Sequence, residues 1–184
     1  MSVSFKPVES EDELRELARL ADEIWHEYWP AIIGDAQTDY MVENFQSLSA
    51  MQRGIAEQGY RYWFIVDDAC EGGEANGAAD GWSSQGIVGY TGGYAEPETN
   101  RFFVSKIYLL ADARGHGYCS KTIGFYDELC RAEDLHAMYL TVNKHNELGI
   151  RAYLAKGFET IDSVETDIGN GFVMDDYIME KQMS

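Results

Sequence analysis

A strand, a short loop and a helix follow one another between residues 106 and 120, and this order constrains the fold more than any other stretch. The strand is predicted by an apolar, β-prone run over residues 107–110. A polar turn follows, with glycine at Gly115 and Gly117. Beyond it the apolar residues take the spacing of one helix face, at Cys119, Ile123, Tyr126 and Cys130.

The loop has the features of an anion site. The first turn of a helix has backbone N–H groups without intrahelical partners, and the helix dipole places positive charge there. Gly115 and Gly117 lack the Cβ atoms that would hinder close approach, and Arg114 adds a positive charge. Two phosphate-loop patterns are excluded, because GxxxxGK[ST] is absent and Ser120 stands where the dinucleotide pattern needs a third glycine. From the loop alone, a phosphate site and a plain tight turn both remain open.

Residues 114–119 read Arg-Gly-His-Gly-Tyr-Cys, and residues 146–158 read NELGIRAYLAKGF. The first segment resembles the pyrophosphate loop, Arg/Gln-x-x-Gly-x-Gly/Ala, of the GNAT superfamily of N-acetyltransferases. The second resembles that family's later signature, with an asparagine, a tyrosine and a Gly-Phe pair. The two motifs stand in the family's order, about 30 residues apart, and the resemblance covers residues 102–181. Cys119 departs from the usual glycine or alanine but is still small.

The resemblance implies an enzyme that moves an acetyl group directly from acetyl-CoA to a primary amine, without a covalent enzyme intermediate. It implies that Tyr153 protonates the departing thiolate, that Asn146 hydrogen-bonds near the pantetheine, and that Trp29 and Ile33 line the acceptor site. The expected cofactor-binding residues are the pantetheine strand, Ile107, Tyr108 and Leu109, and the pyrophosphate loop, Arg114, Gly115, His116, Gly117, Tyr118, Cys119 and Ser120.

Each of these residues also has a structural interpretation. Tyr153 would pack beside Phe158, Asn146 would cap the helix that starts at residue 147, and Trp29 would pack in the core. The general base is the weakest assignment, because residues 102–108 contain no carboxylate. Glu96, just upstream, is the best candidate. Glu27, His26 and Asp175 are more distant ones, and the alternatives are a relay from Tyr108 through water and a chain of water molecules to bulk solvent.

The order of predicted elements favours an α+β fold, with a mixed, twisted sheet of about six or seven strands and helices on both faces. Strands are expected near residues 3–8, 60–67, 86–95, 101–110, 137–143, 158–166 and 172–181, with a hairpin turn at residues 169–171. Helices are expected at residues 11–29, 36–58 and 147–156 in addition to the one after the loop. Residues 1–184 are predicted to form one domain, with an acceptor-side half over about 1–100 and an acetyl-CoA-binding half over about 101–184.

The formal net charge of −18 argues against nucleic acid as a partner. It is compatible with a cationic acceptor, and equally with a simple role in solubility. No apolar run is long enough to span a membrane and the first residues do not resemble a signal peptide, so a cytoplasmic protein is expected. The three cysteines lack metal-ligand spacing, which predicts no metal site and a reducing environment.

The first functional hypothesis is acetylation of a small-molecule amine. The alternatives are acetylation of a protein or peptide, and a coenzyme A-binding sensor without turnover. The family habit and the apolar last strand are compatible with a homodimer. The glycine- and acid-rich segment 68–86, which includes Trp82, is expected to be an exposed mobile loop.

Overall fold

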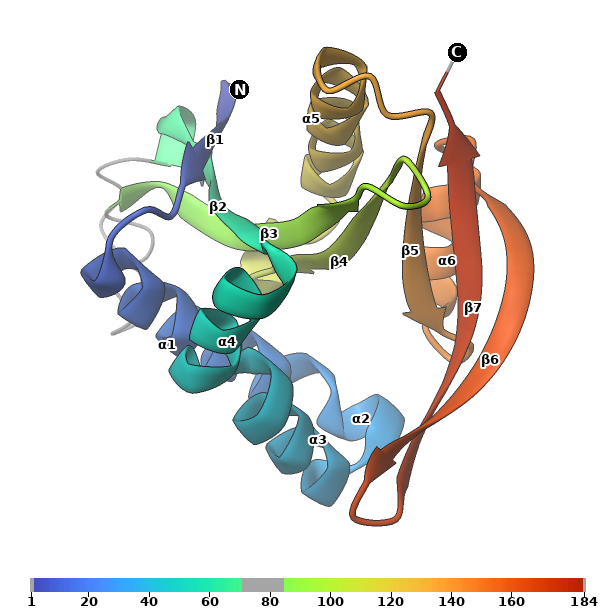
Figure 1. Ribbon diagram of the computed structural model, residues 1–184. Coiled ribbons are helices and arrows are strands. Elements are labelled where there is room, and N and C mark those ends of the chain that lie inside the picture. Colours follow the sequence, from blue (N-terminus) through green and yellow to red (C-terminus); the bar gives the residue numbers. More distant parts are fainter. Residues whose placement is uncertain (1, 71–84, 184) are drawn as a thin grey trace. The chain divides into compact units, whose positions relative to one another are not determined.

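The computed structural model describes residues 2–70 and 85–183, and seven strands of these residues form one mixed sheet (Figure 1). The strand order is β1-β2-β3-β4-β5-β7-β6, in which β4 and β5 run parallel while β1–β2, β5–β7 and β6–β7 are antiparallel. The strands are β1 (Val3–Pro7), β2 (Arg61–Asp67), β3 (Ile87–Glu96), β4 (Arg101–Leu109), β5 (Ala137–Asn143), β6 (Glu159–Gly169) and β7 (Phe172–Gln182). The predicted α+β fold with a mixed sheet is therefore confirmed.

The helices begin and end at signals present in the sequence. Ser10 caps α1 in a capping box with Glu13, and Ser47 caps α4. Gly59 ends α4 in the left-handed conformation, with φ of +71°. The helices are α1 (Glu11–Tyr28), α2 (Pro30–Ile33), α3 (Asp35–Met41), the π-helical η1 (Val42–Gln46), α4 (Leu48–Gln58), α5 (Tyr118–Ala132) and α6 (Glu147–Leu154).

One local prediction was wrong. The segment after α1 was expected to be a loop, but residues 30–33 form the short helix α2. Pro30 occupies its first turn, where the fixed φ of proline suits a helix and the missing N–H leaves no bond unmade. Gly34, at φ of +84°, ends this turn.

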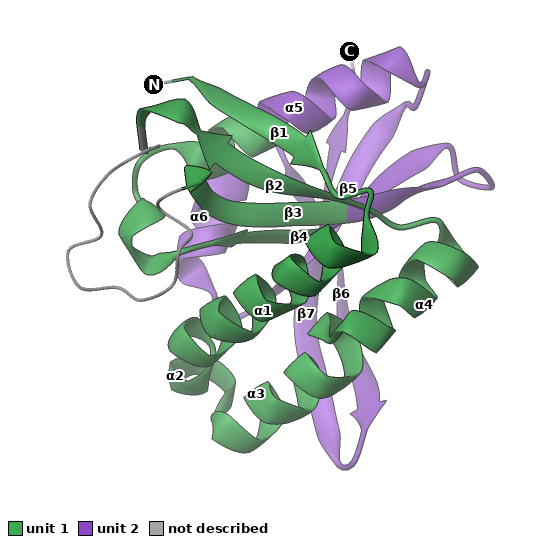
Figure 2. Cartoon of the chain, turned by 90° about the vertical axis from the view of Figure 1, so that its left-hand side faces the viewer, with its two compact units in different colours: residues 1–92, 106–122 green, residues 93–105, 123–184 purple. Residues whose placement is uncertain are grey.

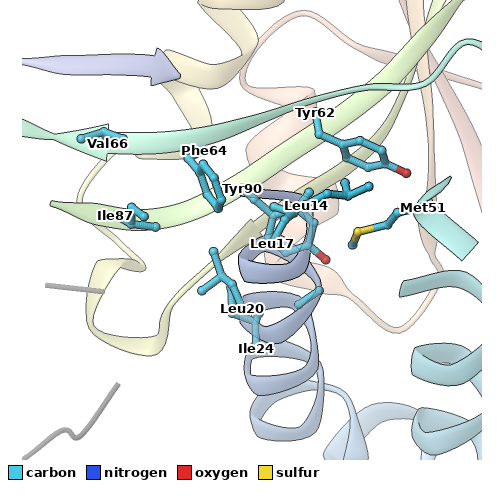
Figure 3. Packing of buried hydrophobic residues seen from close by; sticks show 11 residues of the cluster. Leu14, Leu17, Leu20, Ile24, Met51, Tyr62, Phe64, Val66, Ile87 and Tyr90 are labelled. Carbon is cyan, nitrogen blue, oxygen red and sulfur yellow. The ribbon is translucent and has the colours of Figure 1, made fainter. Parts of the chain in front are cut away.

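The chain divides into two compact units (Figure 2), the first made of residues 1–92 and 106–122. Successive side chains of strand β2 in this unit point to opposite faces of the sheet. Both faces are buried, because six consecutive residues of the strand, 62–67, are buried. On one face Tyr62, Phe64 and Val66 pack with α1 (Figure 3). On the other, Ile65 packs in a cluster with Tyr118 at the start of α5. Helices therefore cover both faces of the sheet in this unit.

The second unit contains residues 93–105 and 123–184. Here β5 pairs with β7 along seven residue pairs, whereas β4 pairs with β5 only from Arg101 to Phe103. Strands β6 and β7 form the predicted hairpin, whose turn residues Gly169, Asn170 and Gly171 all have positive φ.

The predicted mobile loop between residues 68 and 86 starts with a 3-10 turn, η2 (Asp68–Cys70). Residues 71–84, including Trp82, lie outside the described residues. Among the residues that are described, no helix has both the length and the apolar composition needed to cross a bilayer.

Candidate active site

The glycine loop joins β4 to α5 through a short 3-10 turn, η4 (Ala111–Ala113). Gly115 and Gly117 have φ of +82° and +84°, a conformation that other residues adopt only with strain. No atom lies within 4 Å of a Cβ built at either glycine, so both face open space. The backbone bond from Lys121 N–H to the Gly117 carbonyl starts the helix ladder, which leaves the N–H groups of the first turn without acceptors in the ladder. This is the local geometry that favours an anion.

Tyr118 ties this loop to the sheet. Its hydroxyl donates a 2.7 Å hydrogen bond to the buried carboxylate of Asp67 at the end of β2, and this bond holds the pKa of Asp67 below its usual value. The side chain of Tyr118 therefore serves the fold. The neighbouring His116, Cys119 and Ser120 are not fully buried, and Cys119 is a reduced thiol.

Arg114 holds the loop against α1 rather than pointing its charge into the anion site. Its guanidinium forms two hydrogen bonds with the Glu27 carboxylate, and its Nε donates to the Leu109 carbonyl at 3.2 Å. The guanidinium also lies 4.6 Å from the ring centre of Tyr28. The predicted contact between this side chain and phosphate would thus require it to leave Glu27.

The predicted pantetheine strand is half-buried at Ile107, Tyr108 and Leu109. Its β3 side is occupied, since Leu110 N–H donates to the Val88 carbonyl at 3.0 Å. Among the described residues, the β4–β5 pairing covers Arg101 to Phe103 and does not extend to the predicted pantetheine strand. An extended ligand can pair with a strand beyond the end of such a ladder.

The predicted acceptor residue Trp29 is buried, whereas Ile33 is half-buried. The Trp29 ring stacks on Trp25 with ring centres 5.0 Å apart, and Trp25 meets Tyr108 edge-on at 5.4 Å. The structure therefore connects the end of α1 to the predicted pantetheine strand through aromatic contacts. In the described part of the chain, Trp29 Nε1 is buried and has no hydrogen-bond acceptor.

Lys106 is a buried cation that the sequence reading did not single out. It is only 6% exposed, and its Nζ lies 3.4 Å from the Phe45 carbonyl of η1. Burial lowers its pKa to about 8. The available signal was the alternation along β4, which puts Lys106 in the same inward row as Phe102 and Val104.

Helix α6 of the second unit carries the two residues of the later signature. The Asn146 side chain caps the helix by accepting the Gly149 N–H at 3.1 Å, as the structural interpretation expected. A Cβ at Gly149 would lie 2.9 Å from Asn146 Nδ2, which explains the glycine at this position. The ring of Tyr153 is half-buried and lies 5.7 Å from that of Phe158. These contacts hold α6 in place. The binding role of Asn146 and the catalytic role of Tyr153 stay predictions.

Glu96, the predicted general base, lies at the end of β3 and is already engaged. Its carboxylate accepts hydrogen bonds from the hydroxyls of Thr99 and Tyr139, and it lies 3.6 Å from the Arg101 guanidinium. These partners link the end of β3 to its turn and to β5. They weaken the case for Glu96 as a base, since a base needs one oxygen directed at its substrate. Within residues 2–70 and 85–183, no three His, Cys, Asp or Glu side chains cluster as metal ligands.

Comparisons with known proteins agree with this geometry. The model of the acetyltransferase (GNAT) family matches residues 20–158. PaiA N-acetyltransferase from Thermoplasma acidophilum, solved in complex with coenzyme A, superposes with a TM-score of 0.72 at 17% identity, covering 99% of both chains. Spermidine N-acetyltransferase from Vibrio cholerae gives 0.64 at 17% identity, covering 99% of this chain and 94% of the other. Nourseothricin acetyltransferase gives 0.55 at 18% identity, covering 70% and 68%.

At these identities the structural likeness shows the fold alone. No curated protein sequence matches the chain. The family model, however, matches more than half of the chain and includes both the glycine loop and the Asn146–Phe158 signature. The chain therefore belongs to the acetyltransferase (GNAT) family and is an acyltransferase.

Proposed function

We propose that the protein transfers the acetyl group of acetyl-CoA directly to a primary amine of a small molecule. The observation that carries this proposal is the loop before α5, where Gly115 and Gly117 adopt positive φ and face open space at a helix N-terminus. A pyrophosphate group fits a loop that lacks Cβ atoms at these two positions and precedes the first turn of a helix. The coenzyme A complex of the Thermoplasma acidophilum protein supports the same ligand.

We assign different residues to the parts of the reaction. The loop from Arg114 to Ser120 would bind the pyrophosphate through its backbone, and Ile107 to Leu109 would pair with the pantetheine amides. Tyr153 would give its phenolic proton to the thiolate as it leaves, because a phenol and a thiol have pKa values within about two units. Acetyl-CoA supplies an activated thioester, so the protein needs no nucleophile of its own.

The acceptor class is inferred from charge and from the relatives. With a net charge of −18, the protein attracts cationic amines over long distances. The named neighbours acetylate spermidine and nourseothricin, which are small molecules. Tyr108 on the predicted pantetheine strand is half-buried and is backed by the buried rings of Trp25 and Trp29, which gives the strand apolar surroundings.

A thiol-release assay tests this proposal. Purified protein is incubated with acetyl-CoA and, separately, with polyamines, aminoglycosides, amino acids and short peptides. The proposal expects coenzyme A release that depends on a small amine and exceeds the rate of hydrolysis without acceptor. Release with peptides alone would contradict the small-molecule acceptor. Tight acetyl-CoA binding without release on any acceptor would favour a sensor.

A further inference from the structure

One buried carboxylate of the second unit has no role in the reaction proposed above. Asp176 on β7 is 4% exposed. Among the described residues its side chain makes no hydrogen bond or ion pair, and only the charges of Asp175 and Lys144 act on it. Asp175, its neighbour in sequence, is by contrast paired with Lys144. The residue is largely buried, yet its carboxylate oxygens are not among the fully buried atoms that lack a partner, so the group still meets solvent and is not used by the fold.

Asp176 lies beside the carboxyl end of β5. Asp176 is in register with Asn143, the last residue of β5, so their side chains lie on the same face. Strand β5 runs parallel to β4 but pairs with it only to Tyr139, and its last four residues pair with β7 alone among those described. The carboxyl ends of parallel strands, where pairing stops, are the usual place for a ligand.

This end of β5 also leads directly to the predicted acid. Asn143 is followed within three residues by Asn146, the cap of α6, and α6 carries Tyr153. The segment between them is anchored to β7, because Lys144 N–H donates to the Asp175 carbonyl at 3.1 Å. Strand β7, which holds Asp176, and helix α6, which holds Tyr153, thus belong to the same unit and are connected through this anchored segment.

The proton affinity of Asp176 is suited to accepting a proton near neutral pH. Burial raises its pKa to about 6, the charge of Asp175 raises it further, and that of Lys144 lowers it. On the facing strands its register partners are the uncharged Asn143 and Val164. Above about pH 6 the carboxylate is ionised, and a base with a pKa close to the working pH is the most effective one.

We propose that Asp176 is the general base of acetyl transfer, taking the proton from the acceptor amine. The nitrogen bonds to the thioester carbonyl carbon, the carbon–sulfur bond breaks, and the sulfur leaves with the proton of Tyr153. The proton lost by the amine ends on Asp176 and the proton lost by Tyr153 ends on the thiol, so the step balances. This inference rests on the proposed function.

The test compares Asp176→Asn with Asp175→Asn, a matched neighbour that is paired with Lys144. At saturating acetyl-CoA, kcat/KM for the best amine is measured from pH 5 to pH 9. Asp176→Asn is expected to lower kcat/KM by about a hundred- to ten-thousandfold and to abolish the acid limb near pH 6. Affinity for acetyl-CoA should stay the same.

Asp175→Asn is expected to keep most of the activity at pH 8. It should move the acid limb to lower pH, because one of the charges that raises the pKa of Asp176 is gone. The pH profile of Asp175→Asn tests the role of Asp176 in a protein that keeps Asp176. The test therefore remains valid even if Asp176→Asn folds poorly. A wild-type melting temperature or higher is expected for Asp176→Asn at pH 8, because the variant removes a charge that burial disfavours.

The outcomes separate this inference from the proposed function. Wild-type transfer with an unchanged rate and acid limb in Asp176→Asn would overturn the role of Asp176 and leave the transferase activity intact. An acid limb that stays in place in Asp175→Asn would also overturn it. If the wild-type protein transferred no acetyl group to any amine, the proposed function itself would be refuted.

Discussion

Replacing Gly117 with alanine separates the strain of the loop from its use as a ligand site. Gly117 has φ of +84°, and alanine in this region costs about 1–2 kcal/mol. The new Cβ meets no protein atom within 4 Å, so no further loss of stability is expected from packing. For a chain of this size the strain corresponds to a drop in melting temperature of roughly 2–8 °C.

The effect on the ligand should be larger than the effect on the fold. The added methyl group occupies the space in which a pyrophosphate oxygen would approach the backbone. Loss of one charge-assisted hydrogen bond costs about 1.5–3 kcal/mol, so affinity for acetyl-CoA should fall by roughly ten- to a hundredfold or more. Calorimetric titration with acetyl-CoA measures this change directly.

The chain offers a matched control at Gly171 in the β6–β7 turn. Gly171 has φ of +81° and also has no atom within 4 Å of a built Cβ. Gly171→Ala should therefore lose as much stability as Gly117→Ala and bind acetyl-CoA like the wild type. Equal affinities in the two variants would refute the assignment of the loop to pyrophosphate.

Three further variants test other parts of the site. Tyr153→Phe should lower kcat by about ten- to a thousandfold at unchanged acetyl-CoA affinity, and an unchanged kcat would remove it from the reaction. Glu96→Gln should keep kcat within about threefold, because its partners hold the fold, and a hundredfold loss would restore it as a base. Burial lowers the pKa of Lys106 to about 8, so its charge destabilises the fold at pH 7 and this cost fades as pH rises toward 10.5. In denaturant titrations Lys106→Met should raise the free energy of unfolding by up to about 3 kcal/mol at pH 7 and by less at pH 10; a loss at pH 7 would contradict a net cost of burying this cation.

The sequence predicted well those features that short-range chemistry decides. The capping box of Ser10 and Glu13, the helix end at Gly59 and the turn at Gly169 to Gly171 each depend on residues a few positions apart. The strand expected near residues 60–67 was also found as β2, although its burial on both faces depends on distant residues. These elements, taken in order, were sufficient to predict the fold class.

Long-range partners were not predictable in the same way. Arg114 carries the charge expected at a phosphate loop, yet it pairs with Glu27, 87 positions away in sequence. Tyr118 similarly reaches Asp67 across 51 positions. Whether a side chain is used by the fold or left for a ligand depends on which residues the tertiary structure brings next to it.

The burial of ionisable groups is the other part that the sequence did not reveal. Asp176 looks like an ordinary surface residue in sequence, and only the alternation along β4 signalled the burial of Lys106, but both are less than 10% exposed. Their altered pKa values follow from this burial and could not be inferred from neighbouring residues alone. Asp176 is a candidate base for this reason, while Glu96, chosen by its place in sequence, is occupied by structural partners.

The most direct test of the account follows the acetyl group itself. The protein is incubated with acetyl-CoA labelled in the acetyl carbons and with the best amine of the thiol-release screen, and the product is identified by mass spectrometry and NMR. The account predicts labelled acetyl on the primary amine nitrogen, in equal amount to the coenzyme A released. Coenzyme A release that leaves labelled acetate and unmodified amine would contradict it.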